Sequence, residues 1–193
     1  NLKLWLRAGD KAEPESTTAI ARQDFYTDFD GTDDFIQIED DDSLDITGSW
    51  TCLAWIKIGS GTSGYDRIIG KQDTSSNCNY GIGLQNGDEF GAFLNDGGGF
   101  DALYYTTALD VGEWYHVAGI WDTSKLYVYI DGQLKTTSSD LSSANSSVAN
   151  NGELLIGLNQ TNGAENFKGQ ISSASVYQTA LDAQTISQMA KSR

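Results

Sequence analysis

Carboxylates gather at two places early in the sequence, and their chemistry suits a hard cation. Asp30, Asp33 and Asp34 share one short turn, and an acidic run extends from Glu39 to Asp42. Calcium prefers carboxylate and carbonyl oxygens, although the spacing here is not that of an EF-hand. We therefore expect Asp30, Asp33 and Asp34 to be ligands of a Ca²⁺ ion, together with backbone carbonyls. The alternative is a solvated turn that its own aspartates cap.

Two carboxylates could instead cleave a glycosidic bond, a reaction that requires them at a fixed separation on either side of the bond. The nearest pair is Glu39 and Asp41, but it lies in a stretch typical of an exposed turn. Nucleophilic catalysis needs a base beside a serine or cysteine. The one histidine, His116, lies in a strand-like segment, where a buried, hydrogen-bonded histidine is the better interpretation. We predict that the chain is not an enzyme and has no catalytic residues.

Aromatic and amide side chains point to a binding role instead. A sugar ring has one apolar face and many hydroxyls, so its site combines an aromatic surface with a few placed polar groups. Strand alternation puts Tyr115 and Trp121 on the face that points away from the core residues of their strand. It puts Trp55 on the corresponding face of its own strand. The predicted ligand-binding residues are Trp55, Tyr65, Asp66, Tyr115, Trp121, Asn159, Asn162 and Asn166. The alternative is that these aromatics pack beneath a covering loop.

Charge and cysteine content restrict the partners and the environment. Asp and Glu number 27 against 12 Lys and Arg, which gives a formal net charge of −15. Such a charge repels nucleic acid and anionic lipid, so we expect no nucleic-acid partner and no membrane insertion. No stretch approaches the roughly 20 apolar residues that span a bilayer. Cys52 and Cys78 are too few for a disulfide scaffold, and they form either one bridge or two free thiols.

The elements that must hold these side chains are strands. In segment 50–58 the apolar residues recur at every second position, which is the period of a strand with one face in a core. Further strands are expected at 2–6, 25–29, 35–38, 67–71, 79–85, 89–95, 103–107, 114–121, 125–130, 153–158 and 171–177. Asn86-Gly87 and Asp131-Gly132 predict tight hairpins. One helix is expected after Asp182, which can cap it. Residues 1–193 are expected to form one domain.

Glycines in two of these strands indicate an unusual sheet face. Gly81 and Gly83 in segment 79–85, and Gly91 in segment 89–95, share the face opposite the core residues. Glycine inside a strand often marks strong curvature or the close approach of another group. We therefore expect a shallow groove on this face.

Several short motifs occur in a characteristic order along the chain. They are segments 28–36, 50–57, 69–71, 80–84, 112–118, 126–132, 155–157 and 167–171, followed by Tyr177 and 180–181. In this order they resemble the pentraxin-like laminin-G domains of the concanavalin A-like lectin fold. The resemblance implies an all-β, two-sheet antiparallel jelly-roll sandwich with a short C-terminal helix, a fold that many lectins share. Relatives usually carry an acidic residue where this chain has Ser172 and Ser173, so an ion held there in relatives would need other ligands here.

The sequence thus predicts a non-catalytic module that binds extracellular carbohydrate, with calcium as a candidate ion. The expected partner is a glycan or glycoconjugate, and the expected location is extracellular, on a cell surface or on a virion. One alternative is a structural or protein-interaction module of a virion decoration or fibre protein, or of a large surface adhesin, with protein partners in a larger assembly. The other is a glycan-cleaving enzyme whose carboxylate pair is unrecognised.

Overall fold

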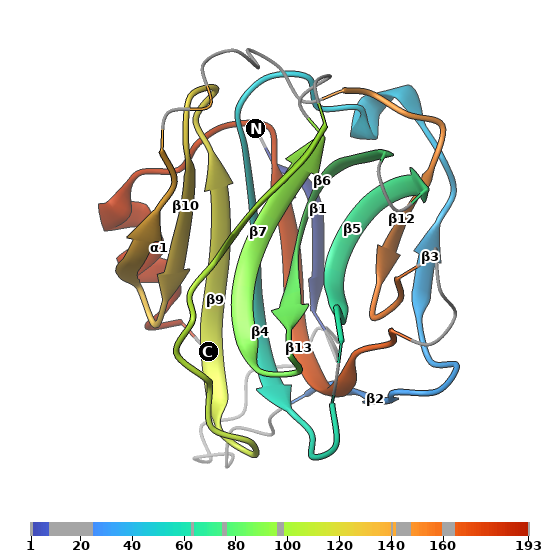
Figure 1. Cartoon of the computed structure of the whole chain (residues 1–193), viewed down its shortest axis with the longest axis vertical. Coiled ribbons are helices and arrows are strands. Elements are labelled where there is room, and N and C mark those ends of the chain that lie inside the picture. The colour runs from blue at the N-terminus through green and yellow to red at the C-terminus, as the bar shows by residue number, and fades with distance from the viewer. Residues whose placement is uncertain are drawn as a thin grey trace, which may run out of the picture.

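Two antiparallel sheets, stacked face to face, account for most of the chain (Figure 1). The computed structural model describes residues 2–7, 25–62, 64–74, 77–95, 99–139, 141, 148–159 and 165–192. The chain crosses repeatedly from one sheet to the other, as in a jelly roll. The predicted fold class, an all-β two-sheet sandwich with a short C-terminal helix, is confirmed.

Sheet A has seven strands and sheet B has six. Sheet A runs in the order β1 (Leu2–Arg7), β13 (Lys168–Tyr177), β4 (Trp50–Ile58), β9 (Trp114–Trp121), β10 (Leu126–Ile130) and β11 (Gln133–Thr137). Strand β2 (Thr27–Asp30) pairs with the beginning of β13, and β1 pairs with its end. Sheet B runs in the order β3 (Ile36–Ile38), β12 (Glu153–Ile156), β5 (Arg67–Thr74), β6 (Asn77–Gln85), β7 (Glu89–Asn95) and β8 (Phe100–Tyr104).

The core lies between the sheets and follows the predicted alternation in the central strands. Trp50, Cys52 and Ile56 of β4 face inward, and Tyr80 and Ile82 of β6 face them from the other sheet. All five side chains are fully buried. Burying apolar surface contributes about 25 cal/mol per Å², so this layer supplies most of the stabilisation of the fold.

The alternation predicted for β9 is wrong. Trp121 is fully buried in the core between the sheets, and Tyr115 packs against that core. His116, Ala118 and Ile120 instead face the outer side of sheet A. Both faces of this strand are covered, so apolar residues occur at both parities and the pattern cannot distinguish inside from outside.

The helix α1 (Ala183–Met189) covers part of the outer face of sheet A (Figure 1). As predicted, Asp182 caps it: its carboxylate accepts a hydrogen bond of 2.7 Å from the Thr185 N–H. Ile186 is the buried residue of the helix. It packs in a cluster that we call the helix-covered cluster, made of Leu53, Ala118, Ile120, Tyr129 and Ile186. Among the described helices, none has the length and apolar content that crossing a membrane requires.

Both predicted hairpin turns are present. Asn86 and Gly87 have φ angles of 53° and 88°, and Asp131 and Gly132 have φ angles of 51° and 74°. Two consecutive positive φ angles are the signature of a type I′ turn, which Asn-Gly and Asp-Gly favour. The first turn joins β6 to β7, and the second joins β10 to β11.

A buried lysine pairs with one carboxylate of the acidic run that follows β3 and with one that comes shortly after it. Lys71 is fully buried, and its Nζ lies 2.6 Å from Asp40 Oδ1 and 3.1 Å from Asp45 Oδ1. It also donates to the backbone carbonyls of Asn150 and Gly152. A charge inside a protein must be paired in this way, because an isolated one is very costly. These carboxylates therefore have a structural role.

The two cysteines are not joined. Cys52 and Cys78 are both free thiols and both fully buried. Burial raises the pKa of Cys78 to about 12, and it raises the pKa of Cys52 as well. Of the two alternatives that the sequence left open, the structure has the free thiols.

Candidate functional site

A row of four residues crosses the outer face of sheet B, one from each of four neighbouring strands. Arg67 of β5 lies opposite Gly83 of β6. Gly83 lies opposite Gly91 of β7, and Gly91 lies opposite Tyr104 of β8. The Tyr104 ring leans over the glycine beside it, since a Cβ atom on Gly91 would come within 2.3 Å of Tyr104 Cδ1. The glycines thus make room for the long side chains at the ends of the row.

The next row along the sheet repeats this arrangement with a phenylalanine. Phe93 of β7 lies opposite Gly81, and a Cβ atom on Gly81 would come within 2.3 Å of the Phe93 ring. The Arg67 guanidinium carbon lies 3.9 Å from the centre of the Phe93 ring and 5.8 Å from that of Phe100. Such a cation–π contact stabilises a guanidinium with little access to water. Arg67 is only 4% exposed.

Two aromatic rings on this face remain open to solvent. Tyr65 is 49% exposed and Phe100 is 39% exposed. The Phe100 ring stacks on Phe93 with centroids 5.8 Å apart, and the Tyr65 ring lies 6.4 Å from that of Tyr104. We call the set Tyr65, Arg67, Phe93, Phe100 and Tyr104 the aromatic face.

Buried polar side chains border the aromatic face. Gln72 Nε2 donates a hydrogen bond of 2.8 Å to Asn159 Oδ1. Asn159 Nδ2 donates to Glu165 Oε2 at 2.5 Å and to the Tyr65 carbonyl at 3.3 Å. Asp66, next to Arg67, is 2% exposed. The strand β5, the loop before it and the segment after β12 together bring these groups to one place.

Several buried polar atoms here have no hydrogen-bond partner among the described residues. They are Arg67 Nε and Nη1, Asp66 Oδ2, Gln72 Oε1 and Tyr104 Oη. Each unpaired buried donor or acceptor costs about 1–3 kcal/mol. A concentration of such atoms therefore indicates a place where water or a ligand completes the hydrogen bonding.

Asp66 has an altered acidity. Burial raises its pKa to about 7, and the negative charge of Glu165 acts in the same direction, while Arg67 opposes both. Burial also raises the pKa of Tyr104, and the charge of Arg67 again acts against it. Near neutral pH, the Asp66 carboxyl can therefore either donate or accept a hydrogen bond.

The expected shallow groove over the glycines is wrong. Phe93 and Tyr104 fill the space above Gly81 and Gly91, and the backbone carbonyl of Asp66 lies 2.5 Å from where a Cβ atom on Gly83 would be. The glycines are needed because the neighbouring rings lie flat on the sheet. What results is a packed surface with aromatic rings exposed on it.

Four of the predicted ligand-binding residues come together near the aromatic face. Tyr65 and Asp66 precede β5, Asn159 contacts the carbonyl of Tyr65, and Asn166 forms a bridge with Arg67. Asn162 lies outside the described residues.

The other three predicted ligand-binding residues lie elsewhere. Trp121 and Tyr115 face the core, as described above, so the expectation that they contribute to a surface site is wrong. Trp55 is half-buried and faces the outer side of sheet A. Its ring meets the His116 ring edge-on, with the two ring centroids 5.5 Å apart. It is therefore on the opposite side of the sandwich from Tyr65.

The sequence did not predict Arg67, Phe93, Phe100 and Tyr104 as site residues. Phe93 has a parity opposite to the core residues of its strand, which was a usable signal. The other three become neighbours only through the register of β5, β6, β7 and β8, which alternation within one strand does not give.

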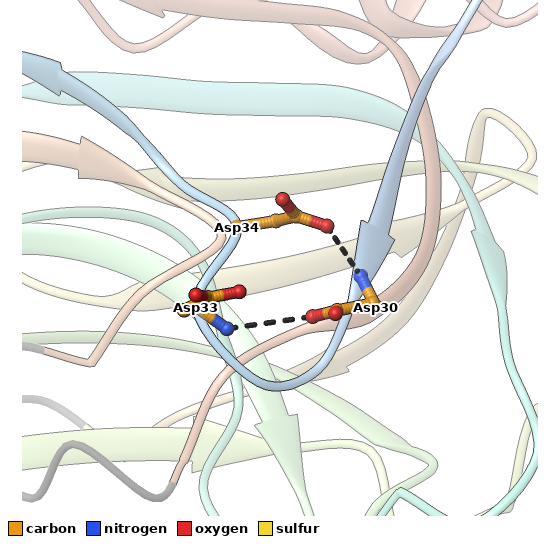
Figure 2. Close-up of side chains that lie close together, drawn as sticks. All are labelled: Asp30, Asp33 and Asp34. Atoms are coloured by element: carbon orange, nitrogen blue, oxygen red, sulfur yellow. Dashed lines mark hydrogen bonds between the residues drawn. The ribbon is translucent and has the colours of Figure 1, made fainter.

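The predicted calcium ligands form a cluster at the end of β2. One carboxylate oxygen from each of Asp30, Asp33 and Asp34 lies within 4.8 Å of the others, and all three residues are exposed. Figure 2 shows that these side chains also serve the turn: Asp34 Oδ2 accepts from the Asp30 N–H at 3.0 Å, and Asp30 Oδ1 accepts from the Asp33 N–H at 3.4 Å. The Asn166 amide nitrogen donates to the Thr32 carbonyl in the same turn.

The carboxylates that were weighed for catalysis have other partners. Asp41 accepts a hydrogen bond of 2.8 Å from the Ser43 N–H and so caps the short 3₁₀ helix η1 (Asp42–Leu44). Glu39 accepts one of 3.2 Å from Gln37 Nε2. Both side chains are exposed.

Solved structures with this fold are numerous, and three illustrate its range. The binding domain of Paraclostridial Mosquitocidal Protein 1 superimposes with a TM-score of 0.71 at 12% identity, over 89% of this chain and 44% of that one. Domain 4 of AbnA, an extracellular arabinanase from Geobacillus stearothermophilus, was solved with arabinotriose; its TM-score is 0.64 at 20% identity, over 96% of this chain and 87% of that one. The CBM40 of Ruminococcus gnavus IT-sialidase, bound to α2,3 sialyllactose, has a TM-score of 0.62 at 15% identity, over 82% and 97%.

These likenesses concern the fold, because the identities are low. The chain spans less than half of the mosquitocidal protein's binding domain. A search of curated protein sequences finds no match. The sequence profile of one family, however, matches residues 30–187. The extent of that match, together with the two-sheet sandwich, shows that the chain belongs to the concanavalin A-like lectin/glucanases superfamily.

Proposed function

We propose that the chain is a non-catalytic module that binds carbohydrate on the aromatic face. The observation that carries this proposal is the pair of exposed rings, Tyr65 and Phe100, beside a group of buried polar atoms without partners. Exposed aromatic rings next to donors and acceptors form the combination that a sugar requires. The solved relatives with arabinotriose and with sialyllactose support this choice of ligand class.

A sugar would use both components of the face. Its apolar side stacks on the Phe100 or Tyr65 ring, and its hydroxyls bond to polar groups at the rim. Arg67 supplies only donors, whereas Asp66 and Gln72 supply acceptors. These polar atoms are buried beneath the exposed rings and hold them in place. They contact a ligand either through a bridging water or after a small shift of those rings.

Binding on this face is testable with one aromatic variant and a matched control. Phe100→Ala removes an exposed ring from the aromatic face, and Phe25→Ala removes one of similar exposure, 46%, from the segment before β2. On a glycan array, the wild type and Phe25→Ala should bind the same glycans, and Phe100→Ala should bind at least about tenfold more weakly. A wild type that binds no glycan, with or without calcium, would contradict the proposal and favour the structural or protein-interaction module of a virion or adhesin.

One observation favours glycan cleavage as a second candidate. Asp66, with its pKa raised to about 7, lies near Glu165, and carboxylate pairs with different pKa values are typical of glycosidases. Against this, Asp66 is 2% exposed and Glu165 is hydrogen-bonded to Asn159. New reducing ends released from the best-bound glycan, and lost in Asp66→Asn, would identify an enzyme. We expect none.

We also propose that Asp30, Asp33 and Asp34 hold a calcium ion. Three carboxylates this close repel one another unless a cation lies between them. A second observation supports the ion: Asn166 is 6% exposed, its amide nitrogen contacts the Thr32 carbonyl, and its Oδ1 has no partner among the described residues. A rotation of this amide by 180° would turn Oδ1 toward the turn, where it could be a further oxygen ligand.

Thermal unfolding measures this site without reference to any sugar. We expect 1 mM CaCl₂ to raise the Tm relative to chelator by several degrees, because an ion that binds only the folded state stabilises it. MgCl₂ at the same concentration is the control, and Asp33→Asn should reduce the shift. Equal Tm values with calcium and with chelator would leave the turn as one that its own aspartates cap.

We place the module outside the cell or on a cell or virion surface, where calcium is abundant.

A further inference from the structure

A recess lies on sheet A, the sheet that does not carry the aromatic face. It has a volume of about 310 Å³, and the described residues that line it are Asp28, Phe29, Lys57, Ile58, Gly59, Ser60, Lys168, Gly169 and Gln170. They come from β2, the end of β4 and the beginning of β13, which lie side by side at the lower end of Figure 1. We call it the lysine pocket. None of its residues belongs to the aromatic face or to the predicted calcium ligands.

Strand register explains why the two lysines share this pocket. Lys57 lies opposite Gln170, and Gln170 lies opposite Asp28, so these three side chains form one row on the outer face of sheet A. Lys168 is in the next row, where Gly59 donates its N–H to the Lys168 carbonyl. Diagonal neighbours on one sheet face are within reach of long side chains.

Glycines direct the Lys168 side chain into the pocket. A Cβ atom on Gly31 would lie 2.8 Å from Lys168 Cβ, and one on Gly59 would lie 3.1 Å from its Cγ. The aliphatic stem therefore runs between these two glycines. The Nζ atom lies 3.9 Å from where a Cβ atom on Gly61 would be, beyond the end of β4. The ammonium thus lies beside the loop that follows β4.

Both ammonium groups lack an ion-pair partner within the described part of the chain. The one carboxylate that lines the pocket, Asp28, accepts a hydrogen bond of 2.7 Å from Gln170 Nε2. Asp30 lies across the strand from Lys168, but its Oδ1 accepts the Thr32 and Asp33 N–H groups. The lining of the pocket thus combines two lysines with one aspartate whose carboxylate is already hydrogen-bonded.

An aromatic wall adjoins the pocket. Trp114 of β9 lies directly opposite Lys57 on the same sheet face, and its ring is 6.1 Å from that of Tyr26. Tyr26 is 42% exposed. A simple anion needs only the ammonium groups, whereas a sugar acid also uses a ring surface and hydroxyl partners such as Asp28, Gln170 and Ser60.

We propose that the lysine pocket binds a carboxylate-bearing sugar unit, with Lys57 and Lys168 as the residues that hold its carboxylate. The volume is close to the lower limit of small-molecule sites, roughly 300–1,000 Å³, which suits a single sugar unit. Charge-assisted hydrogen bonds from two ammonium groups are about twice as strong as neutral ones. The pocket therefore selects acidic over neutral sugars. This inference does not depend on the aromatic face, which lies on the other sheet.

The test is an NMR titration of ¹⁵N-labelled protein with glucuronate, galacturonate and N-acetylneuraminate, and with glucose and galactose as neutral controls. At least one acidic sugar should shift the Gly59 and Gly169 amide signals and bind at least about tenfold more tightly than the neutral sugars. Lys57→Met and Lys168→Met keep the aliphatic stems and should each weaken binding about tenfold. Lys135→Met, on β11, is the matched control and should bind as the wild type does.

A gain of affinity provides a test that misfolding cannot imitate. Asp28→Asn keeps an oxygen acceptor for Gln170 Nε2 and removes the carboxylate from the pocket, so binding of the acidic sugar should tighten severalfold. Phe100→Ala should leave these signals unchanged, which separates this site from the aromatic face.

Three results would overturn the proposal. The first is that none of the acidic sugars shifts the Gly59 and Gly169 signals. The second is that Lys57→Met and Lys168→Met bind as the wild type does. The third is that sodium sulfate gives the same shifts with equal affinity, because the pocket would then hold an adventitious ion only.

Discussion

The outer faces of the two sheets differ in what covers them and in how their polar groups are satisfied. On sheet A, the helix-covered cluster is apolar, and Ile186 of α1 is fully buried in it. On sheet B, no described helix covers the aromatic face, and Phe100 and Tyr65 remain exposed above a buried arginine. Both faces keep buried polar atoms without a partner among the described residues, but they are more numerous beneath the aromatic face than on the outer face of sheet A, where they are the two ring nitrogens of His116.

This difference predicts that one region of the molecule mainly determines its stability and another mainly determines ligand binding. Burying a large apolar side chain contributes about 1.5–3 kcal/mol, and the helix-covered cluster gains that contribution in full. The buried polar atoms beneath the aromatic face cost free energy until another molecule bonds to them. Substitutions in the helix-covered cluster should therefore change unfolding, and those at the exposed rings of the aromatic face should change glycan binding more than unfolding.

The largest effect is expected where the helix meets sheet A. Ile186→Ala removes the buried residue of α1 and should lower the free energy of unfolding by about 2–5 kcal/mol, because a cavity remains in the helix-covered cluster. Urea denaturation measures it. Glycan binding by the folded fraction should stay as in the wild type. If Ile186→Ala lost binding while Phe100→Ala lost stability, the two faces would not be separable in this way.

A smaller effect depends on pH and comes from Asp66. Its folded-state pKa of about 7 exceeds that of an unfolded aspartate, about 3.9, so its favourable contribution is complete below pH 4 and is lost as pH rises to 7. Asp66→Asn should match the wild type at pH 4 and be more stable by about 1–3 kcal/mol at pH 8. Denaturation at the two pH values measures this. Equal differences at both would show that Asp66 titrates normally.

His116 gives the opposite pH dependence and serves as the control from sheet A. Burial lowers its pKa to about 4, so its contribution to stability is complete above about pH 6.5 and is lost as pH falls toward 4. His116→Leu should therefore be less sensitive to acid than the wild type over that interval. Together, His116→Leu and Asp66→Asn separate two parts of the pH dependence of stability: the loss at acidic pH comes from His116 on sheet A, and the loss near neutral pH comes from Asp66 beside sheet B.

The smallest expected change in stability is that of Tyr104→Phe. The substitution deletes a buried hydroxyl whose neighbour is the Arg67 side chain, so stability should change by no more than about 1 kcal/mol, the net contribution of one hydrogen bond. The ring over Gly91 is kept. If Tyr104 bonds to a ligand, glycan affinity falls although stability does not. A marked loss of stability would mean that the hydroxyl is already satisfied in the free protein, for example by an ordered water.

The sequence predicted those elements whose determinants are local. The Asn86-Gly87 turn needs two positive φ angles, and both residues accept them. Asp182 caps the helix by accepting a hydrogen bond from the N–H of Thr185, only three residues later. The alternation in β4 was also readable, because its core side chains, such as Trp50 and Ile56, recur at every second position. In β9 both faces are buried, so Trp121 and His116 could not be placed by period alone.

The candidate site was only partly predictable for a related reason. Tyr65, Asp66 and Asn159 were found by residue type and lie together. Arg67 and Tyr104 were missed, because they are 37 positions apart in the sequence and become neighbours only through the register of four strands. Strand register depends on long-range pairing, which one sequence does not display.

The free, buried cysteines have a consequence for the redox environments in which the molecule can fold. At neutral pH, a thiol whose pKa is about 12 is almost entirely protonated, and only the thiolate attacks disulfides. Once folded, Cys78 is therefore inert toward glutathione and toward oxidoreductases. The sandwich needs no disulfide to reach its native state, so the same fold is compatible with a reducing and with an oxidising environment.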